Sequence, residues 1–234
     1  MQQDLKDILF LPLDLPSLDV DYDKLLEVSQ SMKGDLLPDE YRGCEHIPIR
    51  WLDTSIKGKK EYIWTKFAEE QFPEVKQYII DHVQPFVGGL PRVMIIVTPP
   101  NTQGLDHIDC DRDDFDECQL KFRTVLHGKT STLYFLNERD EKEHAPEINK
   151  QPFLMCGKWP HGLDNSTDKY KFTLAIGAPW KCDPIPELVN LVERSKLKYG
   201  WHDKSQIRLM PDYEKYFKKE KLKVVQEAEK KIFK

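Results

Sequence analysis

The stretch QLKFRTVL, residues 119–126, alternates apolar and polar side chains along most of its length. Alternation with a period of two places successive side chains on opposite faces of a β-strand. The two faces would be Leu120, Phe122, Thr124 and Leu126 on one side and Lys121, Arg123 and Val125 on the other. The stretch therefore predicts a short β-strand with an apolar-rich face and a face that carries Lys121 and Arg123.

Four further stretches between residues 92 and 180 have the composition of short strands. Each is apolar or alternating, several are rich in β-branched or aromatic residues, and turn residues separate them. They are RVMIIVTPP at 92–100, STLYFLN at 131–137, PFLMCG at 152–157 and YKFTLAIG at 170–177. Five short strands in about ninety residues, joined by turns, predict an antiparallel sandwich or barrel.

The segments on either side of this β-rich region are predicted to be an extended arm and helices. Residues 1–22 contain prolines and indicate the arm. Helical spacing of apolar residues predicts four helices, with Pro73 as a kink or a new start in the second. They cover Asp23–Met32, Trp64–Val83, Glu187–Lys198 and Tyr213 to the C-terminus. We expect one domain over 1–234, with an N-terminal arm and helices (1–88), a β core (89–180) and C-terminal helices (181–234).

The composition is that of a soluble globular protein, with 39% hydrophobic and 32% charged residues. A net charge of −5 disfavours a nucleic-acid binder, because such domains usually carry a basic excess. The N-terminus has acids and prolines where a signal peptide needs a basic start, and no stretch reaches the ~18 apolar residues of a membrane span. Five cysteines without a C-x-x-C pair fit a reducing compartment. We expect a cytoplasmic protein without a membrane partner.

His107 and Asp109 follow the first of these predicted strands, and His161 follows the strand at 152–157. In an extended segment, residues i and i+2 point to the same side, so His107 and Asp109 can bind one ion together. An H-x-D sequence is common by chance, and a histidine between proline and glycine is more often a loop residue than a ligand. His161 lies 54 residues after His107, so the two loops meet only if the sheet folds over on itself.

Lys171 and Thr173 stand two positions apart in the predicted strand at 170–177, ten and twelve residues after His161. Both would point to the same side of that strand, into the barrel. An inward lysine in a β core is costly unless it has an anion to bind. The alternative is that Lys171 faces solvent and Phe172 forms the buried face.

In order along the chain come a strand, the pair His107 and Asp109, about fifty strand-rich residues, His161, and then Lys171 and Thr173. This order resembles that of the iron(II)/2-oxoglutarate-dependent dioxygenases over roughly residues 90–180. The resemblance implies a mainly β protein with flanking helices and a double-stranded β-helix core, also described as jelly-roll or cupin-like. It implies that His107, Asp109 and His161 bind iron(II). It also implies that Lys171, where most members have arginine, pairs with the distal carboxylate of 2-oxoglutarate, assisted by Thr173. The implied activity is hydroxylation of a C–H bond with molecular oxygen.

Two stretches are also similar to the aspartyl/asparaginyl β-hydroxylase branch: LKFRTVL at 120–126 and HGLDNSTDKYKFTL at 161–174. The branch implies that Arg123 helps to hold the cosubstrate. Lys121 or Tyr134 could do so if the strand register differs by one or two positions. The chain departs from the branch at Val125, where a histidine is usual, and in having Asp109 as a metal carboxylate.

The sequence leaves the substrate open between an Asp, Asn or Pro side chain in a peptide and a small molecule. Two other functions also remain open: a catalytically silent β-helix protein that binds metal or a carboxylate, and a cupin-type metal enzyme that does not use 2-oxoglutarate. The pair of Lys171 and Thr173 favours the cosubstrate. The expected partners are therefore molecular oxygen and a peptide or small-molecule substrate.

Overall fold

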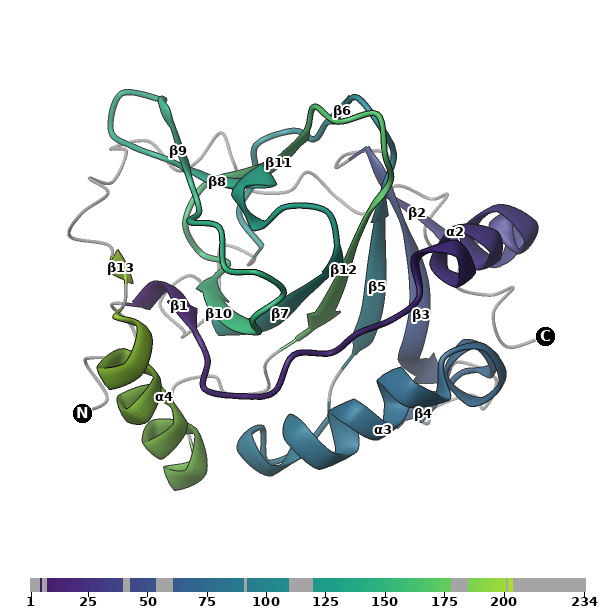
Figure 1. The fold of residues 1–234 in the computed structure, drawn as a ribbon, viewed down its shortest axis with the longest axis horizontal. Helices are drawn as coiled ribbons and strands as arrows, with labels where there is room; N and C mark the ends of the chain where they lie inside the picture. The colour runs from purple at the N-terminus through teal and green to yellow at the C-terminus, as the bar shows by residue number, and fades with distance from the viewer. Residues whose placement is uncertain are drawn as a thin grey trace.

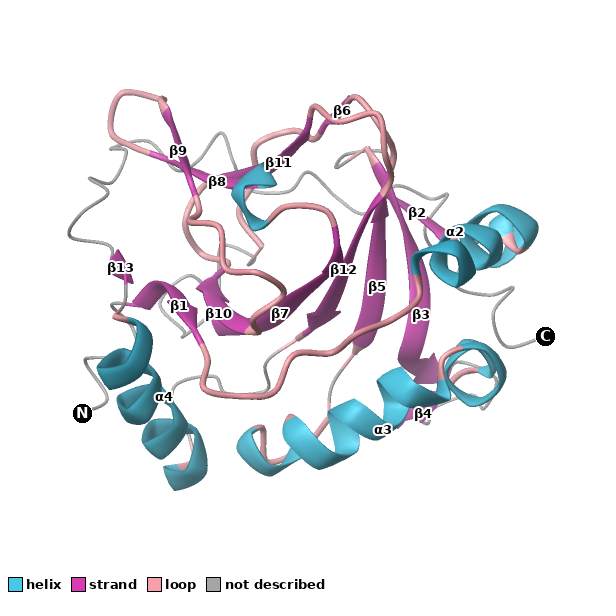
Figure 2. Ribbon diagram, viewed as in Figure 1, coloured by secondary structure: helices cyan, strands magenta, loops and turns pink. Residues whose placement is uncertain are grey.

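A computed structural model of the chain describes residues 5, 8–39, 43–53, 61–90, 92–109, 120–177, 185–200 and 202–203. Within them the fold is mainly antiparallel β-sheet with a few helices (Figure 1, Figure 2). The predicted C-terminal helix from Tyr213 lies outside the described residues.

The strands form a large and a small sheet. The large sheet has the order β13-β1-β10-β7-β12-β5-β3-β2, and β4 pairs with β3. Its strands are β1 (Ile8–Pro12), β2 (Leu37–Asp39), β3 (Cys44–Asp53), β4 (Glu61–Trp64), β5 (Val93–Thr98), β7 (Leu120–His127), β10 (Phe153–Cys156), β12 (Lys171–Ile176) and β13 (His202–Asp203). The small sheet has the order β6-β11-β8-β9, with β6 (Thr102–Gln103), β8 (Leu133–Leu136), β9 (Lys142–His144) and β11 (His161–Asn165).

All five strands predicted from the sequence are present as β5, β7, β8, β10 and β12, and the sheet extends beyond them. The predicted N-terminal arm contains the strand β1 in its described part, and β1 pairs antiparallel with β10. The hairpin β2–β3 extends the same sheet beside β5. A β core confined to residues 89–180 is therefore too narrow, since residues 1–88 supply β1 to β4.

Among the described residues, three α-helices flank the sheets: α2 (Tyr22–Ser31), α3 (Pro73–His82) and α4 (Pro186–Tyr199). Pro73 begins α3, a position where its missing N–H costs nothing, and a π-helical turn at Phe67–Gln71 precedes it. The predicted helix over Trp64–Val83 is thus two segments. Figure 1 shows α3 and α4 on the opposite side of the molecule from β8, β9 and β11. Within the described residues, no helix is long and apolar enough to cross a membrane.

The strands of the large sheet place their two faces in different surroundings. On β12, Phe172, Leu174 and Ile176 belong to the main apolar core, as do the buried residues of α3. The alternate residues Lys171 and Thr173 line a cavity. Since successive side chains of a strand point to opposite faces, β12 presents apolar core residues on one face and Lys171 and Thr173 to the cavity on the other.

Candidate metal centre and its cavity

His107 and His161 face each other across a short antiparallel bridge. Each backbone N–H donates to the carbonyl of the other, at 3.0 Å in both directions. Residues that are directly opposed in this way project their side chains to the same side. The two imidazole centroids lie 4.4 Å apart. His161 is the first residue of β11, and not part of a loop between strands.

The backbone also fixes which nitrogen of each ring can bind a metal. Nδ1 of His107 lies 2.9 Å from the carbonyl oxygen of Leu105, and Nδ1 of His161 lies 2.7 Å from that of Trp159. A carbonyl can only accept, so each Nδ1 carries the proton. The lone pair of each neutral ring is then on Nε2, which is the usual arrangement behind a metal-bound histidine.

Asp109 completes a group of three ligand-type side chains. Its Oδ1 lies 3.6 Å from Nε2 of His107, and its Oδ2 lies 3.5 Å from Nε2 of His161. Neighbouring ligands of an ion with bonds of about 2.1 Å, held at right angles, lie about 3.0 Å apart. The group therefore needs a contraction of about half an ångström to hold an ion. Two imidazoles and one carboxylate are the donor set of a facial iron(II) triad.

The position of Asp109 depends on close contact with the end of β10. Its N–H donates to the carbonyl of Gly157 at 2.7 Å. A Cβ atom at Gly157 would lie 2.8 Å from Cβ of Asp109 and 3.1 Å from Cε of Lys121. Glycine therefore leaves the space in which the carboxylate reaches the histidines.

Two cations from β7 face the same carboxylate. Nζ of Lys121 lies 2.9 Å from Oδ2 of Asp109, and Nη2 of Arg123 lies 3.8 Å from it. Because β7 alternates, both side chains leave the strand on its cavity side. A buried carboxylate requires such partners, so Lys121 and Arg123 stabilise Asp109 in its ionised form.

Lys171 is buried on the same sheet face, with 2% of its surface exposed. Its ammonium donates to the hydroxyl of Thr132. Burial lowers the pKa of Lys171 to about 7, although the negative charge of Glu147 acts to raise it. The hydroxyl of Thr173 is also buried and has no hydrogen-bond partner among the described residues. A buried cation beside an unsatisfied hydroxyl is costly, and a bound anion would satisfy both groups.

These side chains line one cavity with about 750 Å³ of empty space, part of it open to solvent. Its described lining contains one carboxylate, from Asp109, and the cations Arg92, Lys121, Arg123 and Lys171. The positive balance favours an anionic ligand. Of the seven predicted site residues, six line this cavity: His107, Asp109, Arg123, His161, Lys171 and Thr173.

Tyr134 is the predicted site residue that the structure does not bring to the cavity lining. It follows Leu133, which lines the cavity, so alternation along β8 turns it to the other face. Its hydroxyl donates to Asp106 at 2.6 Å, and burial raises the pKa of Tyr134 well above its ordinary value. The prediction that Tyr134 binds the cosubstrate is therefore not supported by its position.

His46 and Arg92 also line the cavity, and neither was predicted from the sequence. His46 lies on β3, within the region expected to form only an arm and helices. A local signal did exist: Cys44 and His46 are separated by one residue, as His107 and Asp109 are. That spacing places two ligand-type side chains on one face of a strand.

Comparisons with known proteins give distant structural likenesses. No protein-family model matches the chain, and a search of curated proteins gives no match. A prolyl-4-hydroxylase from Pseudomonas putida is 12% identical, with a TM-score of 0.42 over 76% of this chain and 95% of its own. A prolyl hydroxylase from Trichoplax adhaerens, solved with a hypoxia-inducible-factor peptide fragment, is 12% identical, with a TM-score of 0.43 over 85% and 90%. A 2OG-Fe(II) oxygenase family oxidoreductase from Burkholderia pseudomallei is 10% identical, with a TM-score of 0.44 over 76% and 90%.

Proposed function

We propose that the chain is an iron(II)- and 2-oxoglutarate-dependent oxygenase that hydroxylates its substrate, built on a jelly-roll core. The observation that carries the proposal is the set of side chains that line one cavity. Two histidine Nε2 atoms and a carboxylate converge on one point, and a buried lysine and an unsatisfied hydroxyl line the same space. A purely structural role does not account for a lysine that burial makes costly to charge, or for a buried hydroxyl without a hydrogen-bond partner among the described residues.

His107, Asp109 and His161 would hold the metal, through the two Nε2 atoms and one carboxylate oxygen. This donor set leaves positions for further ligands on an octahedral ion. When bound, iron(II) and 2-oxoglutarate supply oxidation of a C–H bond by molecular oxygen, with release of succinate and carbon dioxide. Lys121 and Arg123 hold the carboxylate of Asp109 ionised and oriented toward the histidines.

Lys171 and Thr173 would bind the distal carboxylate of 2-oxoglutarate. An ammonium and a hydroxyl two positions apart on β12 offer two donors on one side of the strand. The anion would restore the charge of Lys171, whose pKa burial has lowered to about 7. Arg123 lines the same cavity and remains a predicted contact of the cosubstrate.

The substrate would be an Asp, Asn or Pro side chain in a peptide, or a small molecule. The cavity is partly open to solvent, which gives a substrate of either class a route to it. The size of the cavity does not separate these classes, so the substrate must be found by screening.

Succinate formation tests this function without knowledge of the substrate. The protein is loaded with iron(II), supplied with 2-oxoglutarate, ascorbate and air, and assayed for succinate alone and with peptides, amino acids and nucleosides. We expect succinate from the unmodified protein and none from His161→Ala. A matched control is His82→Ala, because His82 lies on α3, outside the cavity lining. Absence of succinate across the panel from an iron-loaded protein would favour a silent or cupin-type metal protein.

A further inference from the structure

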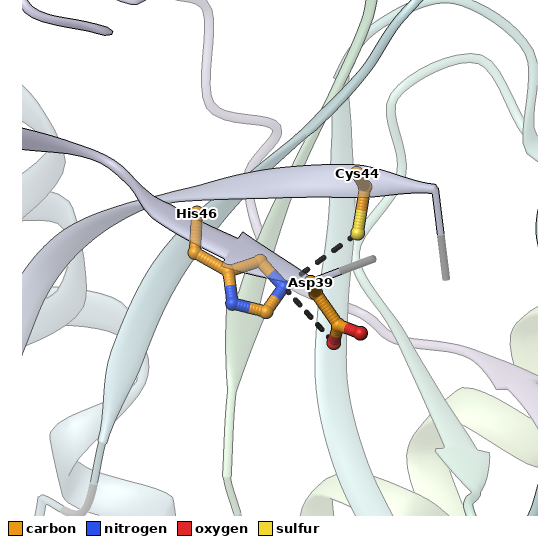
Figure 3. Close-up of side chains that lie close together, drawn as sticks. All are labelled: Asp39, Cys44 and His46. Atoms are coloured by element: carbon orange, nitrogen blue, oxygen red, sulfur yellow. Dashed lines mark hydrogen bonds and ion pairs between the residues drawn. The ribbon is translucent and has the colours of Figure 1, made fainter. Parts of the chain in front are cut away.

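The hairpin β2–β3 carries a second group of ligand-type side chains, Asp39, Cys44 and His46 (Figure 3). Asp39 and Cys44 are direct partners in the register of the two strands. His46 is two residues beyond Cys44, so its side chain leaves β3 on the same face. Strand pairing therefore brings the three side chains together, and Figure 3 shows the imidazole directed at both the thiol and the carboxylate.

The two distances from the imidazole of His46 are close to those around a tetrahedral ion. Nε2 of His46 lies 3.7 Å from Sγ of Cys44 and 3.8 Å from Oδ2 of Asp39. Zinc bonds of about 2.0 Å to nitrogen, 2.3 Å to sulfur and 2.1 Å to oxygen separate tetrahedral ligands by roughly 3.4 to 3.6 Å. The imidazole is therefore within a few tenths of an ångström of the spacing that an ion requires to each of the other two ligand atoms, and the ligand atoms of all three residues lie within 4.8 Å of one another.

We propose that Asp39, Cys44 and His46 form a second metal site, which binds a divalent cation of the zinc class. The donor set differs from that of His107, Asp109 and His161 by its sulfur. A thiolate selects borderline-soft ions such as Zn²⁺, whereas imidazole and carboxylate alone also suit iron(II). Three protein ligands leave a fourth tetrahedral position for water or another ligand. The proposal is independent of the proposed oxygenase function.

The surroundings of the group favour a bound ion over a solvated surface cluster. Cys44 and His46 are buried, and Cys44 packs in a small apolar cluster with Leu37, Met94 and Ile96. An apolar shell limits the access of water and strengthens the interaction of an ion with its ligands. The carboxylate of Asp39 and the thiol of Cys44 lie beside the imidazole of His46, so the three side chains are well placed to bind one cation.

The site would also act on the cavity. His46 lines it and pairs with Ile96 of β5, which in turn pairs with Thr173 of β12. These three residues form one row across the large sheet. An ion on His46 would therefore fix the wall of the cavity two strands away from the proposed cosubstrate contact.

Cobalt(II) titration of the metal-free protein tests the proposal, because a cobalt–thiolate bond gives a sulfur-to-metal charge-transfer band in the near ultraviolet. We expect this band to saturate with one cobalt per chain bound through sulfur, and zinc to abolish it by displacement. It should be lost in Cys44→Ser and retained in Cys156→Ser, the matched control on β10. His161→Ala should retain it, because the described ligand group His107, Asp109 and His161 offers nitrogen and oxygen but no sulfur.

A second variant guards against a hairpin that fails to fold. Asp39→Asn keeps the size of the side chain and the thiolate, so the band should persist while cobalt affinity falls at least tenfold. Far-ultraviolet circular dichroism verifies that each variant is folded. A folded unmodified protein without the band, or a band that survives in folded Cys44→Ser, would overturn the proposal. The three side chains would then be a hydrogen-bonded and ion-paired cluster only.

Discussion

Replacing Lys171 with methionine should make the metal-free protein more stable and its binding of 2-oxoglutarate weaker. The two side chains have similar length, but methionine carries no charge into the buried position. Most substitutions of a buried residue reduce stability. A gain in stability combined with a loss of binding therefore separates a ligand-binding lysine from a structural one.

The stability change follows from the pKa of Lys171, which burial lowers from the ordinary 10.5 to about 7. At pH 7 this difference corresponds to an energetic cost on the order of 4 kcal/mol for the lysine. Loss of the hydrogen bond to Thr132 removes about 1 kcal/mol of stabilisation. The net gain of about 3 kcal/mol should raise Tm by roughly 6 to 12 °C in a chain of this size.

The sign of the pH dependence provides an internal check. Between pH 7 and 10.5 the unfolded chain binds more protons at Lys171 than the folded chain does. Stability of the unmodified protein should therefore rise with pH across this window. The advantage of Lys171→Met should be largest at or below pH 7 and should vanish toward pH 10.5.

Binding should change in the opposite direction. Removing one partner of a buried charged hydrogen bond costs about 2 to 5 kcal/mol, so Kd for 2-oxoglutarate should rise at least ~30-fold. Thermal unfolding and isothermal titration with 2-oxoglutarate measure both effects, with Lys129→Met as the control at an exposed lysine of the neighbouring turn. Affinity within threefold of the unmodified protein would refute the role given to Lys171.

Three further predictions test the cavity and the strand that carries His161. Thr173→Val should leave stability unchanged or raise it by about 1 kcal/mol, because it removes an unsatisfied buried hydroxyl, yet weaken 2-oxoglutarate binding in titration. Thr98→Val removes a similar hydroxyl outside the cavity lining and should not weaken binding. The affinity for 2-oxoglutarate should fall up to tenfold per pH unit above about 7, since binding needs protonated Lys171, whereas Lys171→Arg should show no such slope. Gly162→Ala would force a methyl group into the tyrosine of the paired strand β8 and should lower stability by about 1 to 3 kcal/mol and reduce iron content. Gly34→Ala has open space around it and should change stability far less.

The strands around the cavity could be predicted because their signal is local. Alternation in QLKFRTVL correctly assigned Lys121 and Arg123 to one face and Phe122 to the other. The orientation of Lys171 could not be decided in this way, because both faces of β12 are buried. Phe172 packs in the core while Lys171 lines the cavity. The face of β12 that carries Lys171 borders a cavity and not open solvent because the strands β8 and β11 of the small sheet also line that space.

Long-range pairing accounts for most of what the sequence did not predict. Residues 8–12 have no alternating pattern, and their strand exists because they pair with β10, more than a hundred residues later. The bridge between His107 and His161 is equally non-local. His46 escaped prediction because its contribution to the cavity requires β3 to lie beside β5. Tyr134, which was expected at the cosubstrate only for a different strand register, lies outside the cavity lining, because a shift of one residue along a strand reverses the side chain.

Anaerobic addition of iron(II) and 2-oxoglutarate tests the central claim most directly. A keto acid that chelates iron(II) gives a weak visible charge-transfer band, and the arrangement of His107, Asp109 and His161 predicts that band at one equivalent of iron. The band should disappear in His161→Ala and should require more 2-oxoglutarate in Lys171→Met. A protein that binds iron stoichiometrically and shows no band at saturating 2-oxoglutarate would contradict the proposed function.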